Sequence, residues 1–544
     1  MTAWGIVGAV SPKLTNWLTP VWLLGVGMLA GLALLLLLWG LAFLISRLTP
    51  RATADSRRLG SAGGWLAQVA RLPLVLISRR TASEVPQAVR EGALWPMLIV
   101  ALILGAFGIV GAIFVREPVA LLRSLERLPA MGTRTVEAPV PVSLPENRDD
   151  EFADPVAHEV AVSFRQDEIR HIVFRSDQHL TIATRPFREV KPGAEIDLLA
   201  GEDHIWIASR QSVNAFVDQD VERLYVRNLG SVPAKLTCVI TTAPPNPEVL
   251  TIPVTALAVV AVFLLYLIQR FAAPRLSAIA LATHKSEIAQ PLFMIIVAVG
   301  AVLVVVFFPW IPYNTFGEDI KMLKDSGLTL IMILGVIMAV WAASSSIAEE
   351  IEGRTALTVL SKPIGRPSFI VGKFLGIFWT VAVLFVVLGV LFLIMTAYKP
   401  IYDGRESQTQ DVTWQLCHAE MISTVPGLVL AFMETMVLAA LSVAISTRLP
   451  WLANLVICFT IYALGHLTPL IVQSSMGQFV FVQFFGQLIA TIFPNLDHFN
   501  IQAAVAADVP VPPLYLLWAF VYCMIYSVIA MLLALVLFED RDLA

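Results

Sequence analysis

The strongest constraint on this chain is a series of apolar segments, most of them long enough to cross a lipid bilayer. Of its 544 residues, 57% are hydrophobic and only 14% are charged. A helix needs about 20 apolar residues to span the hydrocarbon core, where its backbone satisfies its own hydrogen bonds. We therefore predict a polytopic α-helical membrane protein with about nine transmembrane helices. The predicted spans are residues 21–45, 94–114, 254–268, 291–308, 328–343, 377–397, 428–445, 451–472 and 514–538.

Basic residues between the spans predict the topology. The loop over residues 46–92 carries Arg47, Arg51, Arg57, Arg58, Arg71, Arg79, Arg80 and Arg90. Cytoplasmic loops are enriched in Lys and Arg, so we expect the N-terminus outside and the C-terminus in the cytoplasm. A further apolar stretch, residues 476–493, would reverse the C-terminus if it crossed fully. We interpret it as a re-entrant or outer-leaflet hairpin.

A different period appears between residues 159 and 242, where apolar and polar residues alternate. The alternating apolar positions are Val160, Val162, Phe164, Leu180, Ile182, Ile196, Leu198, Ile205, Ile207, Leu224, Val226, Leu236, Cys238 and Ile240. Alternation with period two predicts strands, here about seven short ones in an inserted all-β, sandwich-like domain on the extracytoplasmic side. Residues 136–155, rich in proline and acid, are expected to form a linker without a core.

These patterns divide the chain into five parts. They are a two-span membrane region with an Arg-rich cytoplasmic loop (1–115), an amphipathic piece and linker (116–158), the β domain (159–249), a third transmembrane helix (250–274) and a helical membrane core (275–544).

A charged segment follows the predicted span 328–343 before the chain re-enters the membrane. Glu350 and Arg354 are four residues apart, in the order that favours pairing on one helix face. Pro363 cannot continue a helix in good geometry. The segment is thus expected to form a short helical arm that presents a mixed polar and apolar surface to another protein.

The sequence EEIEGRTALTVLSKPIGR, followed by Phe369, Lys373 and Gly376, resembles the segment after the second membrane helix of ABC type-2 transporter permeases. Ala356 departs from the pattern, since many members are expected to carry a larger apolar residue there. The stretch 275–290 resembles the interfacial elbow helix of that family, and the ending LFEDRDL resembles its C-terminus. The resemblance covers residues 275–544.

The resemblance implies that this segment is a cytoplasmic coupling element docked on a separate ATPase. The residues concerned would be Glu349, Glu350, Glu352, Gly353, Arg354, Thr355, Leu357, Leu360, Lys362, Pro363, Arg366 and Lys373. It also implies a permease subunit of a bacterial inner-membrane exporter, working as a homodimer or paired permease, whose substrate is unidentified. ATP and Mg would bind the partner ATPase, and no cofactor is expected on this chain, which lacks a GxxxxGK[ST] motif.

Other features limit the remaining functions. A net charge of −4 gives no case for nucleic-acid binding. The cysteines are expected to be small buried hydrophobes, and neither they nor the histidines of the β domain follow a metal-ligand spacing. These residues are Cys238, Cys417, Cys458, Cys523, His158, His171, His179 and His204.

Glu434 is the only carboxylate inside a predicted span, so it is a candidate for the translocation path. Asn454 and His466 on the next span are further candidates, although such residues also serve as hydrogen-bonding contacts between helices.

Two alternatives remain at this stage. The β domain could be the working part of a membrane-anchored sensing or cell-surface assembly protein without substrate flux, binding an extracytoplasmic ligand or protein. Alternatively, Glu349, Glu350 and Arg354 match the EExxxR pattern of glutamate intramembrane proteases, with Tyr462 and His466 faintly matching their FxxxH.

Overall fold

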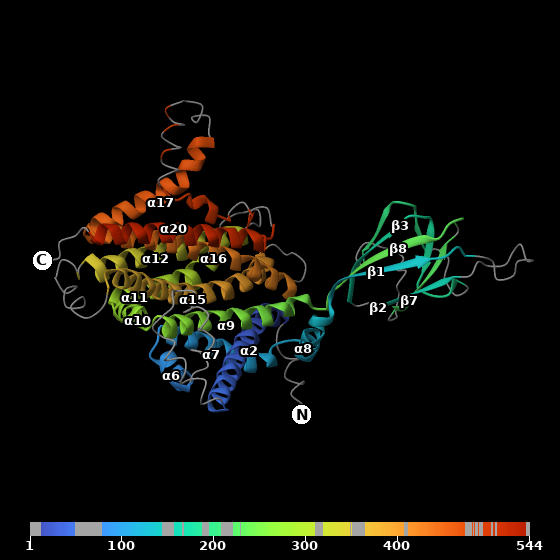
Figure 1. Ribbon diagram of the computed structural model, residues 1–544, viewed down its shortest axis with the longest axis horizontal. Helices are drawn as coiled ribbons and strands as arrows, with labels where there is room; N and C mark the ends of the chain where they lie inside the picture. Colours follow the sequence, from blue (N-terminus) through green and yellow to red (C-terminus); the bar gives the residue numbers. More distant parts are fainter. Residues whose placement is uncertain are drawn as a thin grey trace, which may run out of the picture. The chain divides into compact units, whose positions relative to one another are not determined.

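The computed structural model divides the chain into two compact units (Figure 1). The membrane unit comprises Met1–Arg116 and Thr251–Ala544, and the β unit comprises Glu117–Leu250. Within them the structure describes residues 12–48, 79–143, 157–165, 168–187, 195–207, 221–228, 230–310, 319–348, 350, 365–406, 412–473, 481, 484, 488, 493–501, 504–505 and 509–539. Most of the predicted hairpin 476–493 lies outside the described residues.

The membrane unit is a bundle of helices packed side by side (Figure 1). Its α-helices are α2 (Pro12–Leu48), α6 (Arg79–Arg90), α7 (Trp95–Val110), α9 (Thr251–Ala272), α10 (Pro274–Ile288), α11 (Pro291–Val302), α12 (Asp319–Ala343), α15 (Arg366–Glu406), α16 (Trp414–Ser446), α17 (Trp451–Gln473) and α20 (Pro513–Glu539).

Among the described residues, seven helices are long and apolar enough to cross a membrane, and the bent pair α10–α11 could supply an eighth. Helix α17 adds a shorter apolar stretch, Trp451–Leu467. The predicted polytopic helical architecture is therefore confirmed. Helices α12, α15 and α16 extend well beyond the predicted spans 328–343, 377–397 and 428–445. The added turns carry charged residues, among them Lys324, Lys373 and Lys399, and the fold pairs these three with acidic side chains.

Contacts at the two ends of the bundle show that α12 and α15 run in opposite directions, and the ion pair of Lys324 with Glu420 places the start of α16 beside the start of α12. Lys399, in the last turns of α15, lies 2.9 Å from Asp403 and 3.8 Å from Asp319 at the start of α12. Glu350, just after α12, lies 2.6 Å from Lys373 in the first turns of α15. We call these the Lys399 end and the Glu350 end of the membrane unit.

The chain leaves for the β unit, and returns from it, at the Lys399 end. Near the end of α7, the Gly108 carbonyl accepts a hydrogen bond of 2.8 Å from Trp22 Nε1, and Val21 packs with Ala397 of α15. Thr251, the first residue of α9, lies 2.7 Å from the His418 ring near the start of α16. Both connections to the β unit therefore start from this end.

Helix α10 covers most of the stretch 275–290, for which the sequence predicts an interfacial elbow helix. It meets the following helical stretch at a bend of 64°, where Pro291 begins α11, a position at which its missing N–H costs nothing. Helix α10 packs on α15 at two glycines. A Cβ at Gly372 would lie 2.8 Å from Ile279, and one at Gly376 would lie 2.6 Å from Thr283. Only glycine at these positions permits so close an approach.

The β unit contains two four-stranded sheets of antiparallel pairs. The strands are β1 (Gly132–Val140), β2 (His158–Phe164), β3 (Ile169–Ser176), β4 (Leu180–Ala183), β5 (Ile196–Leu198), β6 (Asp203–Ile207), β7 (Val221–Asn228) and β8 (Ala234–Thr242). One sheet has the order β1-β8-β3-β6 and the other β2-β7-β4-β5. Their apolar faces share one core, as the predicted sandwich requires. Burial in that core raises the pKa of the Cys238 thiol to about 12, so the thiol stays protonated and unreactive at neutral pH.

Strand β1 corrects the expectation that residues 136–155 form a linker without a core. It pairs with β8 along its whole length, and Val140 is fully buried. The prolines suggested a linker because proline cannot donate a ladder hydrogen bond. Strand β1 lies at the edge of its sheet, however, and Pro139 is tolerated there.

Strand β6 corrects a second expectation. Ile205 and Ile207 were predicted to face the core, but Trp206 between them is only 1% exposed and Ile205 is 57% exposed. Because side chains alternate along a strand, this one-residue shift reverses the whole strand. The core thus takes the single large indole, and Ile205 on the opposite face is left exposed.

This register predicts opposite effects for two neighbouring substitutions. Trp206→Ala should destabilise the β unit by about 3–5 kcal/mol, because a large buried side chain leaves a cavity. Ile205→Ala should change stability by about 0.5 kcal/mol or less, since that side chain is exposed. Thermal unfolding and limited proteolysis of the purified full chain would measure both. Equal destabilisation by the two variants would contradict the register.

Candidate functional site

A partly open cavity of about 360 Å³ lies in the membrane unit, between α12, α16, α17 and the segment before α20. Its lining residues are Asp325, Leu328, Thr329, Met332, Gly427, Ala431, Glu434, Tyr462, His466, Asp497, Phe499, Asn500, Ile501 and Val505. Residues one helical turn apart recur on α12, α16 and α17, so each of these helices presents one face to the space. The wall combines carboxylates with apolar and aromatic side chains.

Two of the predicted translocation-path residues meet at this cavity. Glu434 of α16 is only 4% exposed, and its Oε1 lies 2.8 Å from Nε2 of His466 on α17. Tyr462 lies one turn away on α17, with its ring centred 4.8 Å from the imidazole. A carboxylate in a membrane helix costs about 2.5 kcal/mol or more, so it faces a partner or a polar space. Glu434 has both.

Two further carboxylates of the cavity were missed from the sequence. Asp325 was assigned to a loop because the predicted span began at residue 328, whereas α12 begins at Asp319. Asp497 lies in a short 3₁₀ turn, Leu496–Phe499, between α17 and α20. No periodic signal links these residues to Glu434. The sequence signal that was available is the presence of acidic residues just beside apolar segments.

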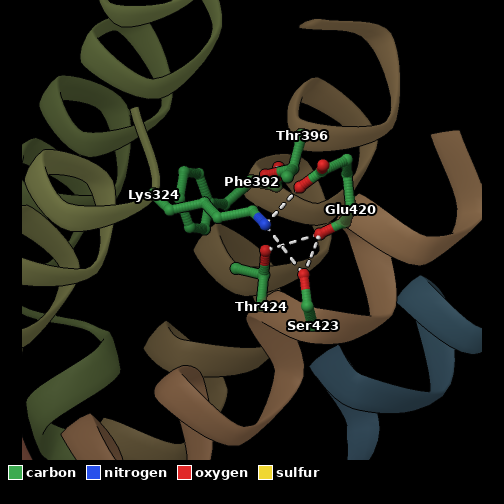
Figure 2. A network of polar contacts seen from close by, with 6 residues as sticks. All are labelled: Lys324, Phe392, Thr396, Glu420, Ser423 and Thr424. Carbon is green, nitrogen blue, oxygen red and sulfur yellow. Dashed lines mark hydrogen bonds and ion pairs between the residues drawn. The ribbon is translucent and has the colours of Figure 1, made fainter. Parts of the chain in front are cut away.

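Lys324, which precedes the lining residue Asp325 in the sequence, does not itself line the cavity. Lys324 of α12 is 4% exposed and forms an ion pair with Glu420 of α16 (Figure 2). Its Nζ also donates a hydrogen bond of 2.8 Å to the Ser423 hydroxyl, and Thr396 and Phe392 of α15 lie beside the pair in Figure 2. The positive charge of Lys324 is thus compensated within this network, which joins the first turns of α12 and α16.

Asn454, the third predicted path residue, does not line the cavity. Its Nδ2 lies 2.8–2.9 Å from the hydroxyl oxygens of Ser344, Ser442 and Ser446, and its side chain is fully buried. This contact joins α17, α16 and the π-helical turn Ser344–Ala348 that follows α12. The geometry is that of an interhelical hydrogen-bonding cluster.

The predicted coupling segment is described only at its flanks. Lys373 is 6% exposed and binds Glu350. Arg366 Nη1 donates a hydrogen bond of 2.9 Å to the carbonyl oxygen of Glu539, at the end of α20. The remaining predicted coupling residues lie outside the described residues. They are Glu349, Glu352, Gly353, Arg354, Thr355, Leu357, Leu360, Lys362 and Pro363.

The described contacts give no support to the glutamate-protease alternative. That chemistry would need Glu350 and His466 to act on one water molecule. Instead, Glu350 binds Lys373 at the Glu350 end, while His466 binds Glu434 at the cavity. The two halves of the suspected motif therefore belong to different sites.

The Asn454 cluster generates a prediction about stability. Asn454→Ala removes the amide that contacts three buried serine hydroxyls and should destabilise the membrane unit by about 1 kcal/mol. Thermal unfolding in detergent would show a lower midpoint for this variant. The matched control Thr460→Ala removes an exposed hydroxyl of the same helix, whose bond is to its own backbone, and should leave the midpoint unchanged. An unchanged midpoint for Asn454→Ala would contradict the role of the cluster.

Comparisons with known proteins agree with the fold. A search of curated protein sequences found no match for the chain. Residues 248–543, more than half of the chain, match the family described as ABC-2 family transporter protein. The match begins just before α9, includes every helix that lines the cavity, and leaves nearly all of the β unit outside. The chain therefore belongs to the ABC-2 transporter family.

Proposed function

We propose that this chain is the permease subunit of an ABC transporter and that a separate ATPase subunit, which binds ATP and Mg, drives it. The observation that carries the proposal is where the two flanks of the predicted coupling segment lie. Both flanks of this segment lie at the Glu350 end, since Glu350 binds Lys373 and Arg366 binds the end of α20. The β unit is connected at the opposite end of the bundle. Within the membrane unit, the helix ends that flank the segment and those that connect to the β unit therefore lie at opposite ends of the bundle.

The Arg-rich segment supports a cytoplasmic Glu350 end. It joins the end of α2 to the start of α7, and α7 runs toward the Lys399 end, where Gly108 contacts Trp22. An excess of arginine on short connections favours the cytoplasmic side. In this orientation the N-terminus and the β unit are extracytoplasmic, the C-terminus is cytoplasmic, and the membrane is a bacterial inner membrane.

Helix α12 supports a route from the ATPase to the cavity. Its last turns lead to Glu350, and its first half provides Asp325, Leu328 and Met332 to the cavity wall. A displacement of the coupling segment would act on α12 directly and on α15 through Lys373. In this proposal two permease copies work with two ATPase subunits, and closure of the ATPases changes access to the cavity for export.

Docking can be tested with a double substitution. Leu357→Asp with Leu360→Asp should remove an apolar docking face, so an ATPase that co-purifies with the parent should be lost and transport abolished. The matched control, Leu199→Asp with Val232→Asp, changes two exposed apolar residues of the β unit and should retain the ATPase. Mass spectrometry of gently purified protein reads out both variants.

Two results would contradict this proposal. One is retention of the ATPase and of transport by the Leu357/Leu360 variant. The other is the absence of any ATPase from the parent preparation in several detergents, which would favour the sensing or assembly role of the β unit.

A further inference from the structure

We propose that the cavity between α12, α16 and α17 binds an organic cation with apolar substituents, and that such a molecule is the substrate class of the transporter. The inference rests on the proposed permease function for its physiological meaning. The binding itself depends only on the cavity. Four properties of the cavity support it: its charge, its apolar wall, its size and the spacing of its carboxylates.

The charge of the wall favours a cation. Among the lining residues, Asp325, Glu434 and Asp497 carry carboxylates, and His466 is the only basic side chain. The nearest lysine in sequence, Lys324, forms its ion pair with Glu420 outside the lining. Glu434 is 4% exposed, and a charge at such a buried position interacts more strongly than in water, because the effective dielectric constant is lower. An anionic ligand would be repelled by this wall.

The apolar part of the wall favours a bulky cation over a small one. Leu328, Met332, Ile501 and Val505 line the space together with the rings of Tyr462 and Phe499. Met332 can adapt to different shapes because its side chain is flexible. Aromatic faces attract cations through their quadrupole. Tyr462 and Phe499 would therefore contact both the charge and the apolar substituents of the ligand. A volume of about 360 Å³ is in the range of small-molecule sites.

The spacing of the carboxylates argues against a bare metal ion. They come from α12, α16 and the segment before α20. In the described part of the chain, no three His, Cys, Asp or Glu side chains lie close enough together to hold a metal. Negative charge that is spread over a cavity suits a large cation with a diffuse charge, since each carboxylate can act without direct coordination.

Two ions of the same shape and opposite charge provide the test. The detergent-purified full chain, without ATPase or nucleotide, is dialysed to equilibrium against radiolabelled tetraphenylphosphonium or tetraphenylborate, with empty micelles as background. We expect saturable binding of tetraphenylphosphonium and none of tetraphenylborate.

Variants then locate the binding. Glu434→Gln keeps the shape and an acceptor for His466, and should weaken tetraphenylphosphonium binding about 10- to 100-fold, as expected when a charged contact is lost. Asp497→Asn changes an exposed side chain of the same cavity and should weaken binding in the same direction, even if Glu434→Gln folds poorly. The matched control Glu539→Gln removes an exposed charge at the end of α20 and should leave binding unchanged.

Several outcomes would overturn the inference. They are equal binding of the two ions, no saturable binding of tetraphenylphosphonium, or unchanged binding in both Glu434→Gln and Asp497→Asn. These results are independent of the docking experiment. Cation binding without any ATPase partner would keep the site and reject the permease, whereas ATPase docking without cation binding would keep the permease and reject this substrate class.

Discussion

The fold of the membrane unit depends on the pairing of charges that are removed from water. Lys399 is fully buried, Lys324 and Glu434 are almost so, and each has an oppositely charged or hydrogen-bonding partner on another segment or on its own helix. An unpaired charge at such a position would cost several kcal/mol. Because the partners come from α12, α15, α16 and α17, satisfying them also fixes which helices are neighbours.

The need of buried polar side chains for partners also bears on where the cavity lies. Most of the bundle interior is filled by apolar side chains, and α12 and α15 pack directly on each other. Space remains between α12, α16 and α17, beside the Glu434 and His466 pair. Polar side chains gather there because the space offers them partners. The serine cluster around Asn454 shows the other solution, in which polar groups satisfy one another without leaving a cavity.

The sequence predicts the helical membrane core and the β unit because both depend on local periodicity. Apolar length predicts α9, α16 and α20, and alternation predicts most of the strands. The sequence also identifies Glu434, since a lone carboxylate in an apolar run is conspicuous. It cannot predict that Glu434 meets His466, or that Asp325 and Asp497 share their cavity, because those contacts arise from tertiary packing. The errors at β1 and β6 have the same origin in tertiary structure: an edge position accommodates Pro139, and the core buries Trp206 while Ile205 stays exposed.

The pairing of β1 with β8 bears on how the β unit is inserted into the chain. Gly132, near the entry to the β unit, pairs with Thr242, near its exit. The first and last strands of the unit are therefore paired neighbours. The core between the two sheets consists of residues of the β unit. A domain with adjacent termini can be inserted into a host chain with little disturbance to either fold. The β unit is in this sense a module, which could be exchanged for another of similar spacing while the helices keep their path through the bilayer.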